Sequence, residues 1–255
     1  MTFSFPWGVR RRRLRLLEAP FPPAWATLLD RMPGVVRLGA GERARLRDIV
    51  RVLVAEKRFE GCGGLVLDDA MRVTIAAQAA RLLVGGEHDY FGNVTTILVY
   101  PSSFRGGEQP VGGGLVATDV GLAGLASHHQ GPVLLAWDAV AREAFGGDGG
   151  RNLVLHEFAH KLDLVDGWAD GMPGLSTRKD RAAWRALVRS EFDAHVEATR
   201  IGLPTVLDAY GATNLAEFFA VATETFFEDA ASLQEALPAL YGLLRAYYHQ
   251  DPATA

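Results

Sequence analysis

Two histidines and a glutamate interrupt an apolar stretch of the chain, residues 152–165, whose sequence is NLVLHEFAHKLDLV. His156 and His160 are four residues apart, and Glu157 follows His156 directly. On a helix this spacing places both imidazoles one turn apart on the same face, where they can reach a single Zn²⁺ at about 2.0–2.1 Å. Glu157 then projects beside the ion, where it can accept a proton from water. This His-Glu-x-x-His pattern is typical of zinc peptidases.

The alternative is an ordinary core helix whose two histidines are only hydrogen-bonded within the protein. Apolar residues on both sides of the pattern predict that the three polar groups are at least partly buried. Buried imidazoles and a buried carboxylate cost free energy unless something pairs with them, and one cation satisfies all three. The local sequence therefore favours a metal site.

A catalytic zinc ion needs a third protein ligand and an open position for water. Asp163 shares the helix face of His160, but its side chain is short and it lies a turn further from His156. We therefore expect Asp163 to hydrogen-bond to a ligand histidine rather than to bind the ion. His195 lies among charged residues in a separate segment and is expected at the surface.

Two glutamates in a second apolar segment, NLAEFFAVATETFF, are the other candidates for the third ligand. Glu217 is flanked by phenylalanines, yet it also has a local explanation. Asn214 can cap the helix, with Glu217 as its partner at the third helical position in a variant of the capping box. Glu224, seven residues further on the same helix face, is the alternative ligand. The residues alone leave this choice open.

The elements that must position these side chains follow from periodicity. Apolar spacing predicts helices before and after a central region of β-branched and glycine-rich segments. The resulting fold class is α+β, mostly helical, with a small mixed sheet whose strands need not be parallel. We expect one domain over residues 1–255, with an N-terminal helical region (1–85) and a catalytic core (86–255). The predicted helices are 23–32, 41–59, 68–86, 152–165, 178–199, 214–229 and 231–250, and the predicted strands are 93–104, 112–118 and 131–140.

Composition excludes several classes of protein. The 255 residues carry a net charge of −4, which indicates neither nucleic acid nor an anionic membrane as the main partner. The single cysteine excludes an internal disulfide and fits a cytoplasmic location. No apolar run approaches the ~20 residues needed to cross a bilayer. The arginine cluster of residues 10–15 is interpreted as a solvated basic start rather than an anion site. The glycine-rich residues 111–131 are interpreted as an ordinary loop rather than a flap.

Two motifs together resemble a known family. HEFAHKLD, followed by DAYGATNLAEFFAVATETFF, is similar to the Mlc titration factor A family of cytoplasmic, glucose-regulated zinc metallopeptidases. The catalytic core of that family is similar to that of the anthrax lethal factor protease. The resemblance extends from about residue 56 to about residue 228. It implies a zincin-like fold, with Glu217 as the third metal ligand and Tyr210 facing the zinc, where its hydroxyl can stabilise an oxyanion.

The sequence thus predicts a zinc-dependent peptidase that acts on peptide or protein substrates. The alternative is a binding protein that sequesters a transcriptional repressor similar to Mlc, as the family name implies. A purely structural zinc site would need a fourth protein ligand, and no thiolate near the motifs could supply it. An extended substrate would pair with a sheet edge, either in residues 93–101 or in residues 131–137.

Overall fold

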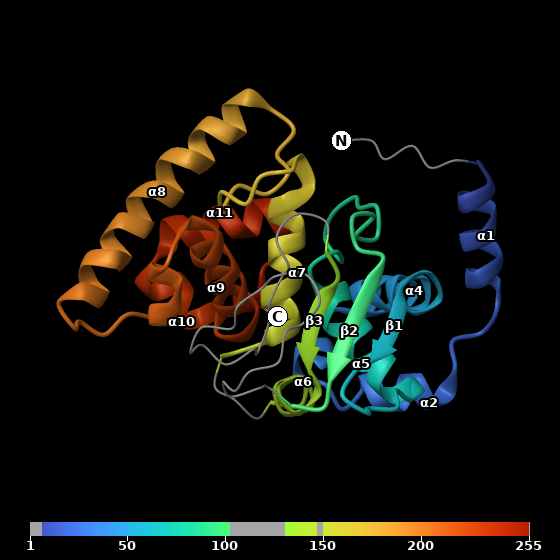
Figure 1. Ribbon diagram of the computed structural model, residues 1–255. Helices are drawn as coiled ribbons and strands as arrows, with labels where there is room; N and C mark the ends of the chain where they lie inside the picture. Colours follow the sequence, from blue (N-terminus) through green and yellow to red (C-terminus); the bar gives the residue numbers. More distant parts are fainter. Residues whose placement is uncertain (1–6, 103–130, 147–149, 255) are drawn as a thin grey trace.

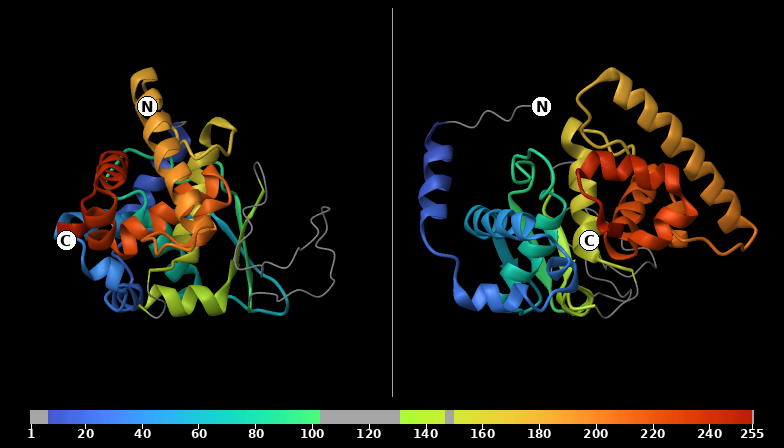
Figure 2. Two further views of the ribbon diagram at one scale, coloured as in Figure 1. Left: turned by 90° about the vertical axis from the view of Figure 1, so that its left-hand side faces the viewer. Right: turned by 180° about the vertical axis from the view of Figure 1, so that it is seen from behind.

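The computed structural model describes residues 7–102, 131–146 and 150–254 of the chain. Helix α7 (Leu153–Asp163) lies between two groups of elements (Figures 1 and 2). On one side are the sheet and the helices α4 (Ala40–Glu56) and α5 (Asp69–Arg81), which lie behind the strands in Figure 1. On the other side are α8 (Arg178–Arg200), α9 (Leu215–Glu228) and the last helices of the chain. The mostly helical α+β class is confirmed.

The described sheet contains β1 (Arg58–Gly61), β2 (Thr96–Tyr100) and β3 (Val133–Ala136) in that order, and both strand pairs are parallel. The expectation of a mixed sheet is therefore wrong for the described strands. Parallel neighbours need a crossover connection, and α5 provides it between β1 and β2. The predicted helix 41–59 overlaps the first two residues of β1, and no strand is predicted before residue 93.

Helix α4 ends at Glu56 because Lys57 adopts an extended conformation, and β1 begins at the next residue, Arg58. The Lys57 ammonium donates hydrogen bonds to the carbonyl oxygens of Phe91 (2.6 Å) and Val94 (2.9 Å), just before β2. These partners lie more than thirty residues away, so helical periodicity alone continued the helix too far. The region predicted as helical, residues 1–85, thus also contributes a strand to the sheet.

Most predicted helices are present. Asp68 caps α5 as expected, since its carboxylate accepts a hydrogen bond from the backbone N–H of Met71 at 2.8 Å. Pro238 divides the last predicted helix in two, because proline is favoured at a helix start and breaks a helix interior. The strand predicted at 112–118 and the loop with His128 and His129 lie outside the described residues. The remaining helices are α1 (Trp7–Glu18), α2 (Pro23–Leu29), α3 (Pro33–Val36), α6 (Trp137–Ala144), α10 (Ala230–Ala236) and α11 (Pro238–Tyr248).

The basic N-terminal segment forms α1, which packs on α4 through Glu56. The Arg13 guanidinium donates two hydrogen bonds to the Glu56 carboxylate, at 2.9 and 2.7 Å.

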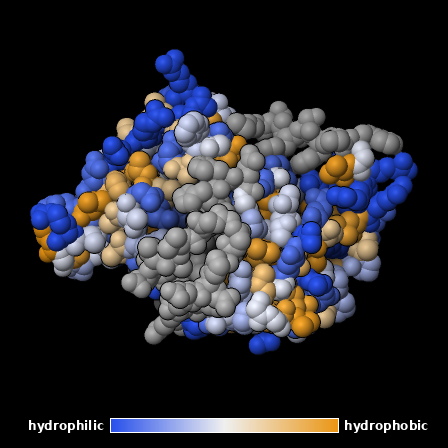
Figure 3. All heavy atoms as spheres, in the orientation of Figure 1, coloured by the Kyte–Doolittle hydropathy of each residue, from blue (hydrophilic) through white to orange (hydrophobic). Residues whose placement is uncertain are grey.

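Hydrophilic residues gather over α1 and along the outer side of α8 in the space-filling view (Figure 3). Among the described helices, none combines the length and apolar character that crossing a bilayer requires.

One hydrophobic cluster connects the elements from α2 to α11. In this cluster Phe158 of α7 and Phe218 and Phe219 of α9 are buried. Trp184 of α8 packs edge-to-face on Phe219, with ring centroids 5.7 Å apart. The Trp184 indole N–H donates to the carbonyl oxygen of Gly171 at 2.8 Å, which holds the loop before α8 in the core.

Gly171 allows this loop to approach the start of α9. Its φ of +75° is in the left-handed region, and a Cβ atom at this position would collide with the carbonyl oxygen of Leu215. Gly167 also has a positive φ of +94°, but a Cβ atom there would meet open space. An alanine at position 167 would thus carry only the cost of a left-handed backbone, whereas an alanine at position 171 would also collide with Leu215.

We expect Gly167→Ala to lower the free energy of unfolding by about 1–2 kcal/mol, the cost of a left-handed alanine. Gly171→Ala carries that cost plus an overpacking cost of roughly 1–3 kcal/mol. The difference should appear in thermal denaturation as a drop in Tm several degrees larger than that of Gly167→Ala. Equal Tm values for the two variants would show that the contact with Leu215 does not constrain the fold.

Candidate metal centre

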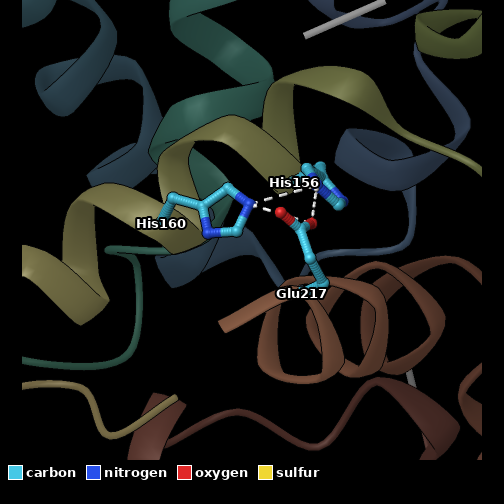
Figure 4. Close-up of side chains that lie close together, drawn as sticks. All are labelled: His156, His160 and Glu217. Carbon is cyan, nitrogen blue, oxygen red and sulfur yellow. Dashed lines mark hydrogen bonds and ion pairs between the residues drawn. The ribbon is translucent and has the colours of Figure 1, made fainter. Parts of the chain in front are cut away.

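The two histidines of the His-Glu-x-x-His pattern lie on one face of α7, as predicted. The helix starts where the Asn152 side-chain oxygen accepts a hydrogen bond from the backbone N–H of Leu155 at 3.1 Å. One turn later the rings of His156 and His160 lie nearly perpendicular to each other, with their Nε2 atoms 3.2 Å apart. Figure 4 shows both rings directed at the same point.

Glu217 reaches this point from the first turn of α9 (Figure 4). Its carboxylate Oε2 lies 3.1 Å from Nε2 of His156 and 3.3 Å from Nε2 of His160. The Asn214 side chain caps the helix at the backbone N–H of Glu217, at 3.0 Å. The local explanation is thus half correct, because Asn214 is the N-cap while the Glu217 side chain turns to the histidines. The structure brings together one ligand atom of each of the three residues within 4.8 Å.

The donor set suits a cation. Burial by itself would lower the pKa of His156, but hydrogen bonds to Glu217 and Glu224 outweigh it and hold that pKa well above the ordinary value. Burial would raise the pKa of Glu217, yet hydrogen bonds from both histidines lower it to about 2. These carboxylates therefore stabilise positive charge between the rings. Imidazole nitrogens and a carboxylate are ligands typical of zinc and related divalent ions.

Glu157 lies beside this cluster in the interior and is 1 % exposed. Burial raises its pKa to about 7, and the positive charges of His156 and Lys161 counteract the rise. One carboxylate oxygen, Oε2, is buried and has no hydrogen-bond partner among the described residues. An unpartnered buried oxygen is costly unless something outside the chain completes it, and water held at a metal site is such a partner.

Tyr210 lies on the short 3₁₀ helix Ala209–Ala212 and remains 43 % exposed. Its ring centroid is 6.0 Å from that of His156, so the phenol belongs to the same site. Burial raises the Tyr210 pKa to about 12, and the negative charges of Glu217 and Glu157 add to the rise. The hydroxyl is therefore a proton donor at neutral pH.

Asp208 holds the Tyr210 turn in place. Its carboxylate accepts a hydrogen bond from the Tyr210 backbone N–H at 2.9 Å and pairs with Arg151, next to the start of α7, at 2.5 Å. The His195 ring nitrogen Nε2 donates to the Asp208 carbonyl oxygen at 3.1 Å. His195 is only 6 % exposed, so the expected surface position is wrong. It packs beside Gly211, which has no side chain to displace it.

Asp163 and Glu224 have other hydrogen-bond partners than the sequence predicts. The Asp163 carboxylate accepts a hydrogen bond from the Gly171 backbone N–H at 3.0 Å, and its other oxygen has no partner among the described residues. Asp163 thus holds the loop after α7 instead of making the predicted bond to a ligand histidine. Glu224 makes such a bond, because its Oε1 lies 2.7 Å from Nδ1 of His156. The signal was the seven-residue spacing from Glu217, which places both glutamates on one face of α9.

A His-Glu-x-x-His helix completed by a glutamate from a second helix, within a mostly helical α+β fold, is the arrangement of a metallopeptidase. A family model described as glucose-regulated metallo-peptidase M90 matches residues 7–249. The chain therefore belongs to this family. The resemblance inferred from the two motifs is confirmed and extends over nearly the whole sequence.

Individual relatives agree with this assignment. The chain is 37 % identical over 253 residues to an uncharacterized protein of Synechocystis sp., which covers 98 % of this chain and 92 % of the relative. It is 32 % identical over 239 residues to Mlc titration factor A of Yersinia pestis (strain Pestoides F), which covers 92 % of this chain and 87 % of the relative. Mlc titration factor A of Yersinia pseudotuberculosis serotype O:3 matches to the same extent.

Metal binding at this site should weaken as the pH falls, and it should begin to weaken at a higher pH than for an ordinary histidine. His156 must lose a proton before its Nε2 can bind an ion, and its pKa is held above the ordinary value of 6.5. We therefore expect the apparent affinity for Zn²⁺, measured by chelator competition, to begin to fall with decreasing pH while the pH is still above 6.5. An affinity that stays constant until the pH reaches 6.5 would contradict the assignment of His156 as a ligand.

Proposed function

We propose that this protein is a zinc-dependent peptidase that hydrolyses peptide bonds with a glutamate as general base. One observation carries the proposal. His156, His160 and Glu217 converge within 4.8 Å, beside a buried Glu157 carboxylate that has an oxygen without a partner among the described residues. These three residues would hold the ion and Glu157 would act on water next to it. Membership in a metallopeptidase family supports the same conclusion.

A bound zinc ion would polarise the carbonyl group of the substrate and lower the pKa of water toward about 7. Glu157 accepts the proton of the attacking water and then passes it to the leaving amine. A pKa of about 7 for Glu157 suits both transfers near neutral pH. The Tyr210 hydroxyl donates a hydrogen bond to the oxyanion that develops on the substrate. Glu224 holds the His156 ring in place through its contact with Nδ1.

The sheet supports one choice of substrate-binding edge. β2 pairs on both sides, whereas β3 is an edge strand among the described residues and contacts α7. An extended peptide that adds to β3 (Val133–Ala136) would therefore run beside the helix that carries Glu157. The other edge, β1, lies across the sheet from α7.

A second function, sequestration of a transcriptional repressor, is favoured by the name of a relative, Mlc titration factor A. In that case a protein partner similar to Mlc would bind to this chain, and hydrolysis would be secondary. Both functions belong in the cytoplasm, which agrees with a single cysteine in the sequence. The following substitution separates them, because it removes a base and leaves the surface unchanged.

We expect Glu157→Gln to reduce kcat/KM on peptide reporters by on the order of 10²–10⁴-fold, since a glutamine cannot accept the proton. Zinc content, measured by atomic emission, should stay at the wild-type level because Glu157 is not one of the converging ligands. A pull-down of a repressor, if the second function holds, should also be unchanged. Full peptidase activity in this variant would exclude Glu157 as the base.

We expect Tyr210→Phe to lower kcat by on the order of 10²–10³-fold with little change in KM, because the hydroxyl acts on charge that develops only in the transition state. Zinc content and the circular dichroism spectrum serve as controls. If kcat falls less than about threefold, Tyr210 is an aromatic wall of the site and not an oxyanion donor.

A further inference from the structure

Glu224 makes two contacts that together determine which nitrogen of His156 carries a proton. Its Oε1 lies 2.7 Å from Nδ1 of His156, on the ring edge opposite the one that faces Glu217. Its Oε2 accepts a hydrogen bond from the backbone N–H of Asn152 at 2.8 Å. Both contacts are in the interior, since the side chains of His156 and Glu224 are each 12 % exposed.

The chemistry of these groups leaves one arrangement for a ligand histidine. A backbone N–H only donates, so Oε2 must accept, and an ionised carboxylate accepts at its other oxygen as well. The Nδ1 atom of His156 must therefore be the donor. In a neutral imidazole the proton on Nδ1 leaves Nε2 with a free lone pair, directed at His160 and Glu217.

The fold holds the carboxylate in this orientation. The Asn152 side-chain amide donates to Glu228 at 2.8 Å and to Gln78 of α5 at 2.9 Å. Arg81 of α5 donates to the same Glu228 oxygen at 2.6 Å. The start of α7 is thereby tied to α9 and α5 by buried polar contacts. Glu224 is consequently bound to a backbone group that has little freedom to move.

We propose that Glu224 is a positioning residue that fixes the Nδ1–H tautomer of His156 and directs its Nε2 into the metal site. The inference rests on the proposed metal centre but does not require peptidase activity. An amide at this position has only one acceptor oxygen for two donors. In Glu224→Gln either the Asn152 N–H or the His156 Nδ1–H loses its acceptor, and the amide NH₂ favours the wrong tautomer.

The test compares Glu224→Gln with a matched control, Glu143→Gln. The Glu143 carboxylate accepts a hydrogen bond from the Leu153 backbone N–H at 2.6 Å, so it lies at the same helix start without contacting His156. Zinc affinity is measured by chelator competition. We expect Glu224→Gln to bind zinc about 10–100-fold more weakly than wild type. We expect Glu143→Gln to stay within about threefold, because its amide oxygen can still accept the hydrogen bond from the Leu153 N–H.

Histidine NMR supplies a readout that a merely structural role would not move. In the zinc-loaded wild-type protein, the Nδ1 proton of His156 should resonate downfield and exchange slowly, and in Glu224→Gln it should shift upfield. Unchanged zinc affinity in Glu224→Gln, or an equal loss in Glu143→Gln, would overturn the proposal. If the Glu224→Gln variant does not fold, the wild-type protein still tests the proposal, because a rapidly exchanging Nδ1 proton of His156 would by itself overturn it. Zinc binding without peptidase activity would count against the proposed function only.

Discussion

Charge compensation in the interior governs the structure around α7. Glu157, Glu217 and Glu224 bring three carboxylates to a region from which the core excludes most water, and such groups are stable only where donors or positive charge meet them. His156 lies between Glu217 and Glu224 and contacts both, whereas His160 contacts Glu217. Each carboxylate has a different environment, and the three roles that we propose for them, as metal ligand, general base and positioning residue, follow from these differences.

Two asparagine N-caps determine where the charged side chains lie along their helices. Asn152 starts α7 and Asn214 starts α9, and in each case a backbone N–H donates a hydrogen bond to the asparagine side-chain oxygen. The caps set the rotation at which each helix begins, so His156 lies one turn into α7 and Glu217 lies in the first turn of α9. Packing of these two helices then brings a carboxylate to both imidazoles. A helix start is also a favourable position for a carboxylate, because the free N–H groups there carry partial positive charge.

The sheet has a supporting role in this arrangement. Its parallel strands need the crossover helix α5, and α5 supplies Gln78 and Arg81 to the polar contacts at the start of α7. The same topology leaves β3 as one of the two edge strands of the described sheet, and β3 contacts α7, which carries the two histidines. The N-terminal third of the chain therefore serves the site indirectly, by holding α7 in place.

Local sequence was sufficient for the features that depend on neighbours along the chain. The four-residue spacing of His156 and His160, the Asn214 cap and the helix periods all follow from the geometry of a single helix, and the family motifs added Glu217 and Tyr210. Tertiary structure alone decided the rest. In the folded protein His195 is buried beside Gly211, and Asp163 accepts a hydrogen bond from the backbone of a loop instead of from a histidine. Glu224 is the residue that contacts His156. The tertiary structure also turned the chain after Lys57 into a parallel strand, because the carbonyl partners of that lysine lie more than thirty residues away. Contacts between residues so distant in the chain have no periodicity, so the helix and strand patterns do not predict them. For Glu224 the sequence offered only its position on the same face of α9 as Glu217.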